Sequence, residues 1–534
     1  MSDAAVRVLP NGHILVDTQH VDARTIVRAL HAFSMIEAYT GRFVRCRLHR
    51  TSLWGAAASG YTSTQIITYL HDVSGTPLDP VVVRTIHTLM QRWGQIMLIG
   101  AAHTPLLVVN DDALRERLRH IPALATFLRD PSPDGWRIDG FQRGALAQAL
   151  WRMGWPLDDR AEVVDGQEFV CQWSTQITLR PYQTDAITAC LAYTHGVVSL
   201  PPGSGKTFIG VGLLAHIQRH TLIITTSRAA ANQWRDSVLQ ATTCQPHHVA
   251  IYRGTHATLA PITITTYQQL VARTALCHAA DWGLIVYDEV HTLPAPVFRT
   301  TAALSTRRRY GLSATLIRED GRIGDVYSLV GPQRYTLPWR TLEAQGFIAP
   351  ASCIEVRVAM SRSEREAYLQ ALPRHQGQQA ACIAGKYAVV IRIAERHAGQ
   401  AILVIGHYLA QLHTLATQTG WPLITGDTPH AQRDAYYAAF RAGQIAQLIV
   451  SRVGNQAIDL PSASVLIQVS GSFGSRQEEA QRLGRILRPK GPDHVAVFYT
   501  LVSAQSREVD DAWQRQRFLV AQGYRYQHLD EGDI

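Results

Sequence analysis

A glycine-rich run carries the residues best suited to hold a phosphate group. Between the apolar run Gly196–Leu200 and the helical stretch Phe208–Arg219 stand Pro202, Gly203, Ser204, Gly205, Lys206 and Thr207. Glycines let the backbone turn tightly so that N–H groups point at phosphate oxygens, and the N-terminus of the next helix favours an anion. Lys206 is expected to reach the β- and γ-phosphates of ATP, and the Thr207 hydroxyl to hold Mg²⁺. The run therefore predicts a nucleotide site.

This run departs from the strict phosphate-loop pattern, which has glycine at the position of Leu200. Without the strand before it and the helix after it, a Gly-Ser turn with a surface lysine would explain the same letters. Lys206 is one of only three lysines in the chain, with Lys386 and Lys490. Arginine replaces lysine elsewhere, as codon bias in a GC-rich genome would produce, so the retained lysines stand out.

An acidic pair follows another apolar run. Leu284–Tyr287 leads directly into Asp288-Glu289-Val290-His291. Carboxylates at the C-terminal end of a buried parallel strand face the crevice in which α/β sheets bind ligands. Asp288 is expected to hold Mg²⁺ through its water shell, and Glu289 to orient and deprotonate an attacking water molecule. An acidic helix start is the alternative, but it does not explain a strand before the pair in the domain that carries the phosphate loop.

A small-residue segment, Gly311–Thr315, comes after a further apparent strand. Its hydroxyl groups, on Ser313 and Thr315, are placed to link a nucleotide site to a nucleic-acid groove. Taken alone, the segment would be a plain turn.

The C-terminal third supplies arginines at helical spacing. Gln481, Arg485 and Arg488 are four and three residues apart, which predicts a shared helix face. Arginine suits bidentate contact with phosphate and keeps its charge. We expect Arg485 and Arg488 to contact the γ-phosphate when a cleft between two lobes closes. A solvated basic helix explains the pattern equally well. Upstream, Asp459 lies in a loop after a strand and is available to a ribose or to an arginine.

Short apolar runs alternate with helical stretches from about residue 176 onward, which is typical of parallel sheets covered on both faces. Two sets of such runs predict two α/β lobes; the runs are Gly196–Leu200, Thr221–Thr225, Ile262–Thr265 and Leu284–Tyr287, then Ala401–Ile405, Gln447–Ser451, Ser464–Val469 and Val495–Thr500. Before them, residues 1–175 show helices (Thr64–His71, Val81–Trp93) and short strands (Ile96–Leu98, Leu106–Val109), an order consistent with a winged-helix-like unit.

Bulk composition indicates a globular protein of roughly three domains, and its basic charge is consistent with a polyanion partner, although many proteins simply have basic surfaces. The chain has 534 residues, 46% hydrophobic and 17% charged, with a net charge of +9. Its seven cysteines form no CxxC pair, which argues against a zinc ribbon or an iron–sulfur cluster. No signal-peptide pattern opens the chain, and no apolar run reaches the roughly 20 residues that span a bilayer. We expect a cytoplasmic protein without a membrane partner.

In chain order these motifs resemble superfamily 2 helicases, and most closely the XPB family in its bacterial and archaeal form. The spelling DEVH at 288–291, the segment Leu179–Gln183 and the triplet Arg318-Glu319-Asp320, similar to the family's RED motif, carry the resemblance. It implies two RecA-like lobes, ATP and Mg²⁺ as cofactors, and 3′→5′ unwinding of duplex or forked DNA, in a monomer that works with a nuclease in some relatives. The chain departs from the usual family sequence at two motifs. It has PPGSGKT where close relatives usually have PCGAGKT, and GLSAT where they have GLTAT.

The resemblance also implies roles for single residues and bounds for domains. Arg180 and Gln183 would contact adenine, and His291, Ser313, Thr315, Arg318, Glu319, Asp320 and Gln481 would couple the nucleotide site to DNA. The expected domains are 1–175 (winged-helix-like plus damage-recognition-like), 176–348 (ATP-binding lobe) and 349–534 (second lobe), with a thumb-like insertion at about 361–386. A restriction or defence translocase, an RNA helicase, and a DNA-binding scaffold with an inactive nucleotide fold are the competing hypotheses.

Overall fold

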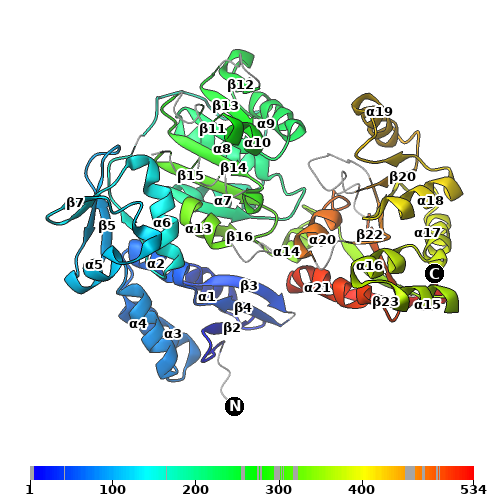
Figure 1. Ribbon diagram of the computed structural model, residues 1–534, viewed down its shortest axis with the longest axis horizontal. Coiled ribbons are helices and arrows are strands. Elements are labelled where there is room, and N and C mark those ends of the chain that lie inside the picture. The colour runs from blue at the N-terminus through cyan, green and yellow to red at the C-terminus, as the bar shows by residue number, and fades with distance from the viewer. Residues whose placement is uncertain are drawn as a thin grey trace. The chain divides into compact units, whose positions relative to one another are not determined.

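The computed structural model describes most of the chain. The described residues are 5–40, 42–163, 165–253, 259–273, 276, 280–293, 297, 301, 304, 306–316, 323–451, 463–471, 475–488, 491 and 494–534. They fall into two compact units, which are Met1–Ser199 with Gly205–Thr336, and Leu337–Ile534 with Leu200–Ser204. Figure 1 shows the elements in chain order by colour.

A seven-stranded parallel sheet forms the centre of the first unit (Figure 1). In spatial order its strands are β12 (Val249–Ile251), β13 (Ile262–Thr266), β11 (Thr221–Thr225), β14 (Leu284–Asp288), β15 (Arg308–Ser313), β10 (His195–Ser199) and β16 (Gln333–Thr336). The central strands are rich in Val, Ile, Leu and Thr, because helices cover both faces of the sheet and almost every residue of β11, β13, β14 and β15 is buried. The helices are α7 (Pro181–Leu191), α8 (Lys206–Ile217), α9 (Arg228–Ala241), α10 (Tyr267–Ala272) and α13 (Ile323–Val330).

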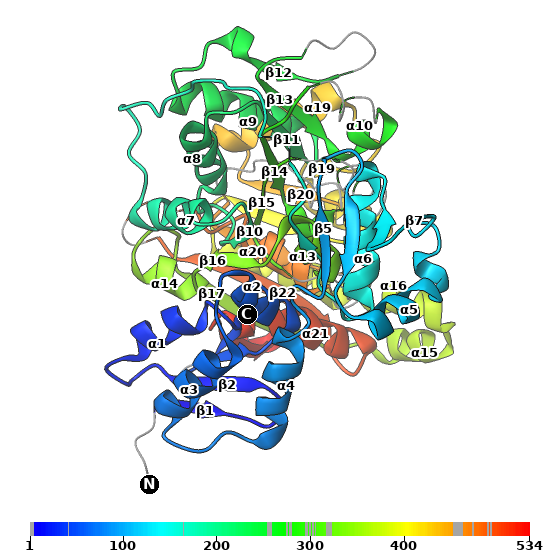
Figure 2. The same ribbon diagram turned by 90° about the vertical axis from the view of Figure 1, so that its left-hand side faces the viewer.

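The N-terminal part of the same unit contains two smaller sheets. The first is antiparallel, and strand β1 packs against α3 (Figure 2); its order is β1 (Val6–Val8), β2 (His13–Asp17), β4 (Phe43–Arg47) and β3 (Met35–Thr40). The second is β7 (Asp130–Ser132), β8 (Gly135–Arg137), β6 (Leu106–Val109), β5 (Ile96–Ile99) and β9 (Asp158–Asp159). The accompanying helices are α1 (Ala23–Leu30), α2 (Arg50–Ala58), α3 (Ser63–Ser74), α4 (Pro80–Met90), α5 (Asp112–Arg119) and α6 (Arg143–Arg152).

Helix α6 joins this N-terminal part to the parallel sheet by packing on α13. A Cβ atom added to Gly324 would lie 1.7 Å from the Trp151 ring, so only glycine lets the indole sit against α13 at that point. Arg152 Nη2 forms an ion pair with Asp325 Oδ1 at 3.3 Å beside this contact. The Arg50 guanidinium also lies over the Trp151 ring, 3.7 Å from its centroid.

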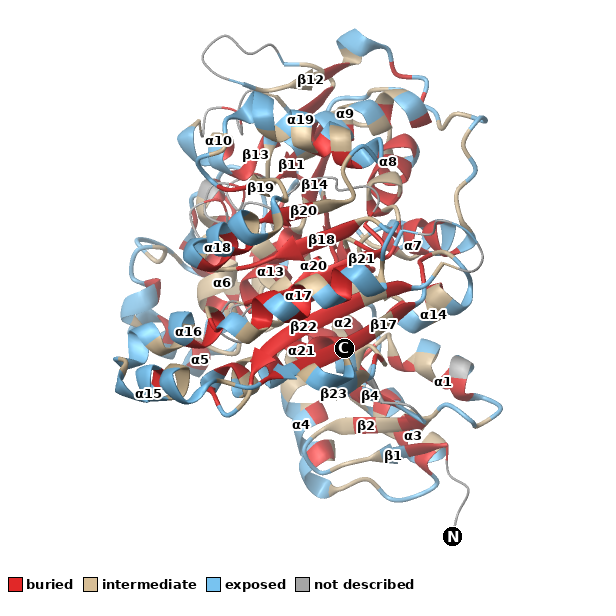
Figure 3. Cartoon of the chain, turned by 90° about the vertical axis from the view of Figure 1, so that its right-hand side faces the viewer, coloured by how far each residue is buried: buried red, intermediate tan, exposed pale blue. Residues whose placement is uncertain are grey.

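The second unit is built on another seven-stranded parallel sheet, whose central strands are buried in Figure 3. Its order is β19 (Leu423–Ile424), β20 (Gln447–Val450), β18 (Ile402–Ile405), β21 (Val465–Gln468), β22 (Ala496–Ser503), β17 (Ala351–Val358) and β23 (Tyr526–Asp530). Its helices are α14 (Trp339–Ala344), α15 (Arg362–Gln370), α16 (Pro373–Ala381), α17 (Ala384–Arg396), α18 (Leu409–Thr419), α19 (His430–Arg441), α20 (Arg476–Leu483) and α21 (Arg507–Ala521).

The predicted fold class, two α/β lobes with parallel sheets after a mixed α+β region, is confirmed. All eight predicted lobe strands are present to within a few residues, as are the two helices and two strands predicted near the N-terminus. Residues 361–386 form α15, α16 and the start of α17, and their role as a thumb stays a prediction. In the described part of the chain, no helix combines the length and the apolar character needed to cross a membrane.

Candidate nucleotide-binding site

The phosphate-loop run lies between strand β10 and helix α8, in the order that the sequence predicts. Gly203 and Gly205 have φ angles of +77° and +76°, in the left-handed region that favours glycine. Lys206 begins α8 and is buried, and Thr207 follows it in the first turn. These conformations suit a loop whose N–H groups turn toward an anion at a helix N-terminus.

Gln183 connects helix α7 to the same loop. Its Nε2 donates to the backbone oxygen of Gly205 at 3.2 Å, and its Oε1 accepts from the backbone N–H of Arg180 at 2.9 Å. A Cβ atom on Gly205 would lie 2.5 Å from that Nε2, so this contact also requires glycine. The Arg180 guanidinium in turn donates to the Tyr182 hydroxyl at 3.1 Å. The structure thus brings the predicted adenine segment against the predicted phosphate loop.

Asp288 is the last residue of β14, where the sequence predicts a metal-binding carboxylate. Trp234 Nε1 donates to its Oδ2 at 3.0 Å, and the Tyr267 hydroxyl donates to its backbone oxygen at 2.8 Å. Burial and the neighbouring Glu289 raise the pKa of Asp288 to about 6, against the hydrogen bond from Trp234 and the charge of Lys206. A carboxylate held in such surroundings is stabilised by a divalent cation, so this donor fits Mg²⁺.

Substitution of Asp288 by asparagine is expected to stabilise the ligand-free protein at pH 8 by a few degrees in melting temperature. The folded pKa lies above the unfolded value of 3.8, so the wild-type protein loses stability as the pH rises from about 4 through about 6. The gain in melting temperature from Asp288→Asn should therefore reach its maximum above pH 6 and vanish near pH 4. Thermal unfolding without nucleotide or Mg²⁺ measures it; a gain of equal size at both ends of this range would contradict the assignment.

Glu289 occupies a strained position directly after β14. Its φ of +49° lies in the left-handed region, which costs a residue with a side chain on the order of 1–3 kcal/mol. The Thr292 hydroxyl donates to its backbone oxygen at 2.8 Å, and His291 Nδ1 lies 3.3 Å from its Oε2. This tight turn, η4 (Val290–Thr292), fixes the backbone that carries the carboxylate predicted by the sequence as a general base.

A buried relay runs from His291 to the small-residue segment after β15. His291 Nδ1 lies 2.6 Å from Ser313 Oγ, and Ser313 Oγ donates its single proton to the Thr315 backbone oxygen. Since that proton is used, Ser313 must accept from His291, which assigns the imidazole proton to Nδ1. The Thr315 N–H also donates to Ser313 Oγ, at 3.2 Å. The acidic turn and the 313–315 segment are therefore directly connected.

Trp234, on helix α9, is a site residue that the sequence motifs did not reveal. A Cβ atom on Gly210 of α8 would lie 2.4 Å from its ring, so glycine makes room for the indole between α8 and β14. The side chain is fully buried, and its N–H reaches the Asp288 carboxylate. The only signal in the sequence is Gly210, one of two glycines inside a largely apolar helix, a feature that marks close packing.

Substitution of Trp234 by phenylalanine keeps most of the ring but removes the donor to Asp288. We expect the Mg²⁺ concentration for half-maximal binding of a fluorescent ATP analogue to change several-fold, with the fold retained. The matched control is Trp282→Phe, because Trp282 is equally buried but donates to the Leu276 backbone oxygen at 3.4 Å. Equal Mg²⁺ dependence in the two variants would show that Trp234 acts only in packing.

The predicted helix face at 481–488 is wrong. Helix α20 ends at Leu483, and Gly484 and Arg485 form a turn closed by the Arg485 N–H to Arg482 oxygen bond of 3.0 Å. Beyond this turn Ile486 and Leu487 are both buried, and Arg485 and Arg488 do not continue the helix that carries Gln481. Gln481 stays on the helix, whereas Arg485 lies in the turn and Arg488 is exposed beyond it.

Arg482, which lies between Gln481 and Arg485 in the sequence, instead forms hydrogen bonds inside the second unit. Its Nη1 donates to Gln468 Oε1 at 2.6 Å and to the Ser470 backbone oxygen at 3.3 Å. Its Nη2 pairs with Glu478 Oε1 at 3.2 Å. Four predicted site residues, Arg318, Glu319, Asp320 and Asp459, lie outside the described residues.

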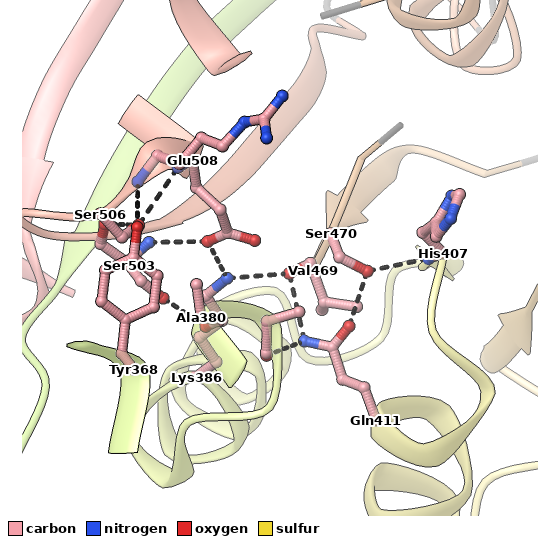
Figure 4. Close-up of polar contacts among 12 residues, drawn as sticks. Tyr368, Ala380, Lys386, His407, Gln411, Val469, Ser470, Ser503, Ser506 and Glu508 are labelled. Carbon is pink, nitrogen blue, oxygen red and sulfur yellow. Dashed lines mark hydrogen bonds and ion pairs between the residues drawn. The ribbon is translucent and has the colours of Figure 1, made fainter. Parts of the chain in front are cut away.

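One of the three lysines forms the centre of a buried polar network in the second unit (Figure 4). Lys386 Nζ donates to Glu508 Oε2 at 2.6 Å and to the Val469 backbone oxygen at 3.2 Å, and its side chain is fully buried. Gln411 Nε2 donates to the same Val469 oxygen, and its Oε1 accepts from the Ser470 hydroxyl at 2.7 Å. Lysine suits this place because a compact ammonium donates in several directions, whereas guanidinium is planar.

Comparisons with known proteins indicate the family of the chain. Three family models match: ERCC3/RAD25/XPB C-terminal helicase at residues 342–533, Type III restriction enzyme, res subunit, at 176–318, and Helicase conserved C-terminal domain at 6–130. The chain is 41% identical to a protein named DNA 3′-5′ helicase XPB from Kineococcus radiotolerans, over 100% of this chain and 98% of the relative. A protein of the same name from Mycobacterium tuberculosis is also 41% identical, over 100% and 99%.

Among solved structures, S. cerevisiae Dbp5 bound to RNA and ADP BeF3 has a TM-score of 0.50 at 14% identity, over 66% of this chain and 90% of that one. This likeness concerns the fold alone. Two parallel-sheet lobes, one with a phosphate loop and an acidic turn, define the class of superfamily 2 helicases. Within that class, the chain belongs to the XPB family of DNA helicases.

Proposed function

We propose that this protein is an ATP-dependent DNA helicase of the XPB type, with 3′→5′ polarity, that acts in DNA repair. The observation that carries the proposal is 41% identity over the whole chain to relatives named DNA 3′-5′ helicase XPB. Nucleotide use follows from membership of a helicase family, and DNA is the partner that the relatives' names specify. ATP and Mg²⁺ are proposed as the particular nucleotide and metal.

In this proposal the phosphate loop and the ends of β14 and β15 bind and hydrolyse the nucleotide. N–H groups of the loop ending at Gly205 hold the phosphates, and Lys206 contributes its charge. Thr207 and Asp288 would hold Mg²⁺, which when bound neutralises charge on the phosphate oxygens. Glu289, held in its strained turn, orients the attacking water and takes its proton. The hydrogen bonds that join His291, Ser313 and Thr315 transmit a conformational change of the acidic turn toward the DNA-binding residues.

The remaining assignments rest on the family resemblance. Arg180 and Gln183 are proposed adenine contacts, Asp459 a ribose contact, and Arg485 and Arg488 γ-phosphate contacts. The proposed DNA-coupling residues also include Arg318, Glu319, Asp320 and Gln481. Residues 361–386 are the proposed thumb that grips the duplex, and the bounds 1–175, 176–348 and 349–534 remain the proposed domains. A monomer, a cytoplasmic location and a nuclease partner complete the proposal.

Strand displacement tests the polarity directly. Duplexes with a 3′ tail, a 5′ tail, a fork or flush ends are incubated with ATP and Mg²⁺. We expect displacement from the 3′-tailed and forked duplexes, and a reduced yield with Arg318→Ala at unchanged ATP turnover. Preferential displacement from the 5′-tailed duplex would contradict the proposal.

A duplex translocase is the second candidate, because residues 176–318 match the model of a restriction-enzyme subunit. This function predicts ATP turnover stimulated by duplex DNA and removal of a bound triplex strand, without separation of the duplex strands. An RNA helicase would instead be stimulated by RNA and displace RNA strands.

A further inference from the structure

Two cysteines that lie far apart in the sequence are in contact in the first unit. Cys171 Sγ and Cys244 Sγ are 2.7 Å apart, and both residues are buried free thiols. A disulfide bond is about 2.0 Å long, so the two sulfur atoms need to approach by less than an ångström to form one. Cys171 precedes the first parallel-sheet lobe, and Cys244 follows helix α9 within it.

Backbone pairing holds the two segments in register. The Ser174 N–H donates to the Ala241 oxygen at 2.8 Å, and the Thr243 N–H to the Gln172 oxygen at 2.9 Å. Between these bonds, Trp173 and Thr242 form an antiparallel bridge. The contact between the thiols is therefore fixed by the main chain on both sides.

The two thiols differ in exposure and in acidity. Cys171 is 0% exposed and Cys244 is 6% exposed, so an oxidant from solvent reaches Cys244 first. The hydrogen bond between the two sulfur atoms lowers the pKa of Cys244, while the same bond and burial raise the pKa of Cys171. A more acidic, reachable thiol beside a second cysteine is the arrangement of a reactive cysteine with its resolving partner.

We propose that Cys171 and Cys244 form an oxidation site at which hydrogen peroxide produces a disulfide. The Cys244 thiolate attacks one peroxide oxygen, the O–O bond breaks, and the departing hydroxide takes up the Cys244 proton as water. The sulfur of Cys171 then attacks the sulfenic sulfur of Cys244. The S–O bond breaks, and the hydroxide leaves with the Cys171 proton as a second water. The two thiols lose two electrons and the peroxide gains them.

The bond would close a loop that contains α7, β10, the phosphate loop, α8, β11 and α9. It would hold the segment that enters the lobe against the end of α9. Closing so long a loop restricts the unfolded chain, so the oxidised protein should unfold at a temperature higher by about 5 °C or more. Simple packing, in which buried thiols act as small apolar residues, predicts no such change.

Peptide mapping tests the site on the full-length protein. After treatment with hydrogen peroxide, thiols are blocked under denaturing conditions and the protein is digested. We expect a peptide pair linked through Cys171 and Cys244 that dithiothreitol separates. Cys46, Cys190 and Cys353, whose pKa values burial raises to about 12, should be recovered as thiols. Absence of the linked pair, at peroxide doses that oxidise free glutathione in the same tube, would overturn the proposal.

Serine substitutions test the order of the steps. In Cys171→Ser, the sulfenic acid at Cys244 has no resolving thiol, so dimedone should label it; Cys244→Ser should leave Cys171 unlabelled. Both variants should lose the rise in unfolding temperature on oxidation. Cys382→Ser is the matched control, because this partly buried cysteine lies in the second unit, and it should keep the linked pair. Labelling of Cys171 in place of Cys244, or a temperature rise that persists in Cys171→Ser, would refute the mechanism.

Discussion

Glu289→Gln is expected to lower DNA-stimulated ATP turnover by at least about 100-fold while ATP still binds. Glutamine matches glutamate in size, so the turn after β14 should persist, including the Thr292 hydroxyl bond of 2.8 Å to the backbone oxygen of residue 289. The variant loses only the ability to take a proton from the attacking water. Turnover measured with saturating duplex DNA, and binding measured with a fluorescent ATP analogue, separate the two effects.

Thr292→Val provides the matched control for this prediction. It removes a hydroxyl from the same turn without touching the carboxylate, so turnover should fall by much less than in Glu289→Gln. If Glu289→Gln retained more than about a tenth of wild-type turnover, another group would have to be the base. If it lost nucleotide binding as well, the residue would act in ground-state binding and not in the chemical step.

Lys386→Met is expected to reduce the free energy of unfolding of the second unit by about 3–5 kcal/mol. The substitution leaves the Glu508 carboxylate buried without its ammonium partner, and it removes the donor to the Val469 oxygen. In this variant the Glu508 carboxylate loses the bond from Lys386 and retains the hydrogen bond from the Ser503 N–H, at 3.0 Å. Denaturation by guanidinium chloride, followed by circular dichroism, measures the loss.

Removal of both charges distinguishes the ion pair from packing. The double variant Lys386→Met, Glu508→Gln has no unpaired charge, so it should recover most of the stability that the single variant loses. The stability of Lys386→Arg should lie between the stabilities of the single and the double variant, because a guanidinium is too broad for a site that is closed on all sides. A double variant as unstable as Lys386→Met would mean that side-chain volume, not charge, is what the site requires.

Much of the fold is predictable because its signals are local. Strands such as Thr221–Thr225 and Ile402–Ile405 are continuous runs of β-branched and aliphatic residues, as a sheet covered on both faces requires. The phosphate loop and the acidic turn are equally local, since each lies within a few residues of the strand that positions it. The sequence alone therefore predicts that Asp288 stands at the C-terminal end of a buried strand.

The features that the sequence did not predict correctly depend mostly on contacts between residues distant in sequence. Helical spacing across residues 481–488 ignores Gly484, a weak helix former that directly follows the last residue of α20. The bond from Trp234 to Asp288 joins residues 54 positions apart, and no spacing rule predicts it. Lys386 stands out only by its rarity, because its partner Glu508 is 122 residues away.

ATP turnover of the wild-type protein and of Lys206→Ala, each with no nucleic acid, duplex DNA, single-stranded DNA or RNA, tests the central claim most directly. If the protein is a DNA-driven motor, DNA stimulates the wild-type protein at least several-fold, RNA stimulates it less, and Lys206→Ala loses about 100-fold or more in every condition. Turnover that DNA does not change, or that Lys206→Ala retains, would contradict it.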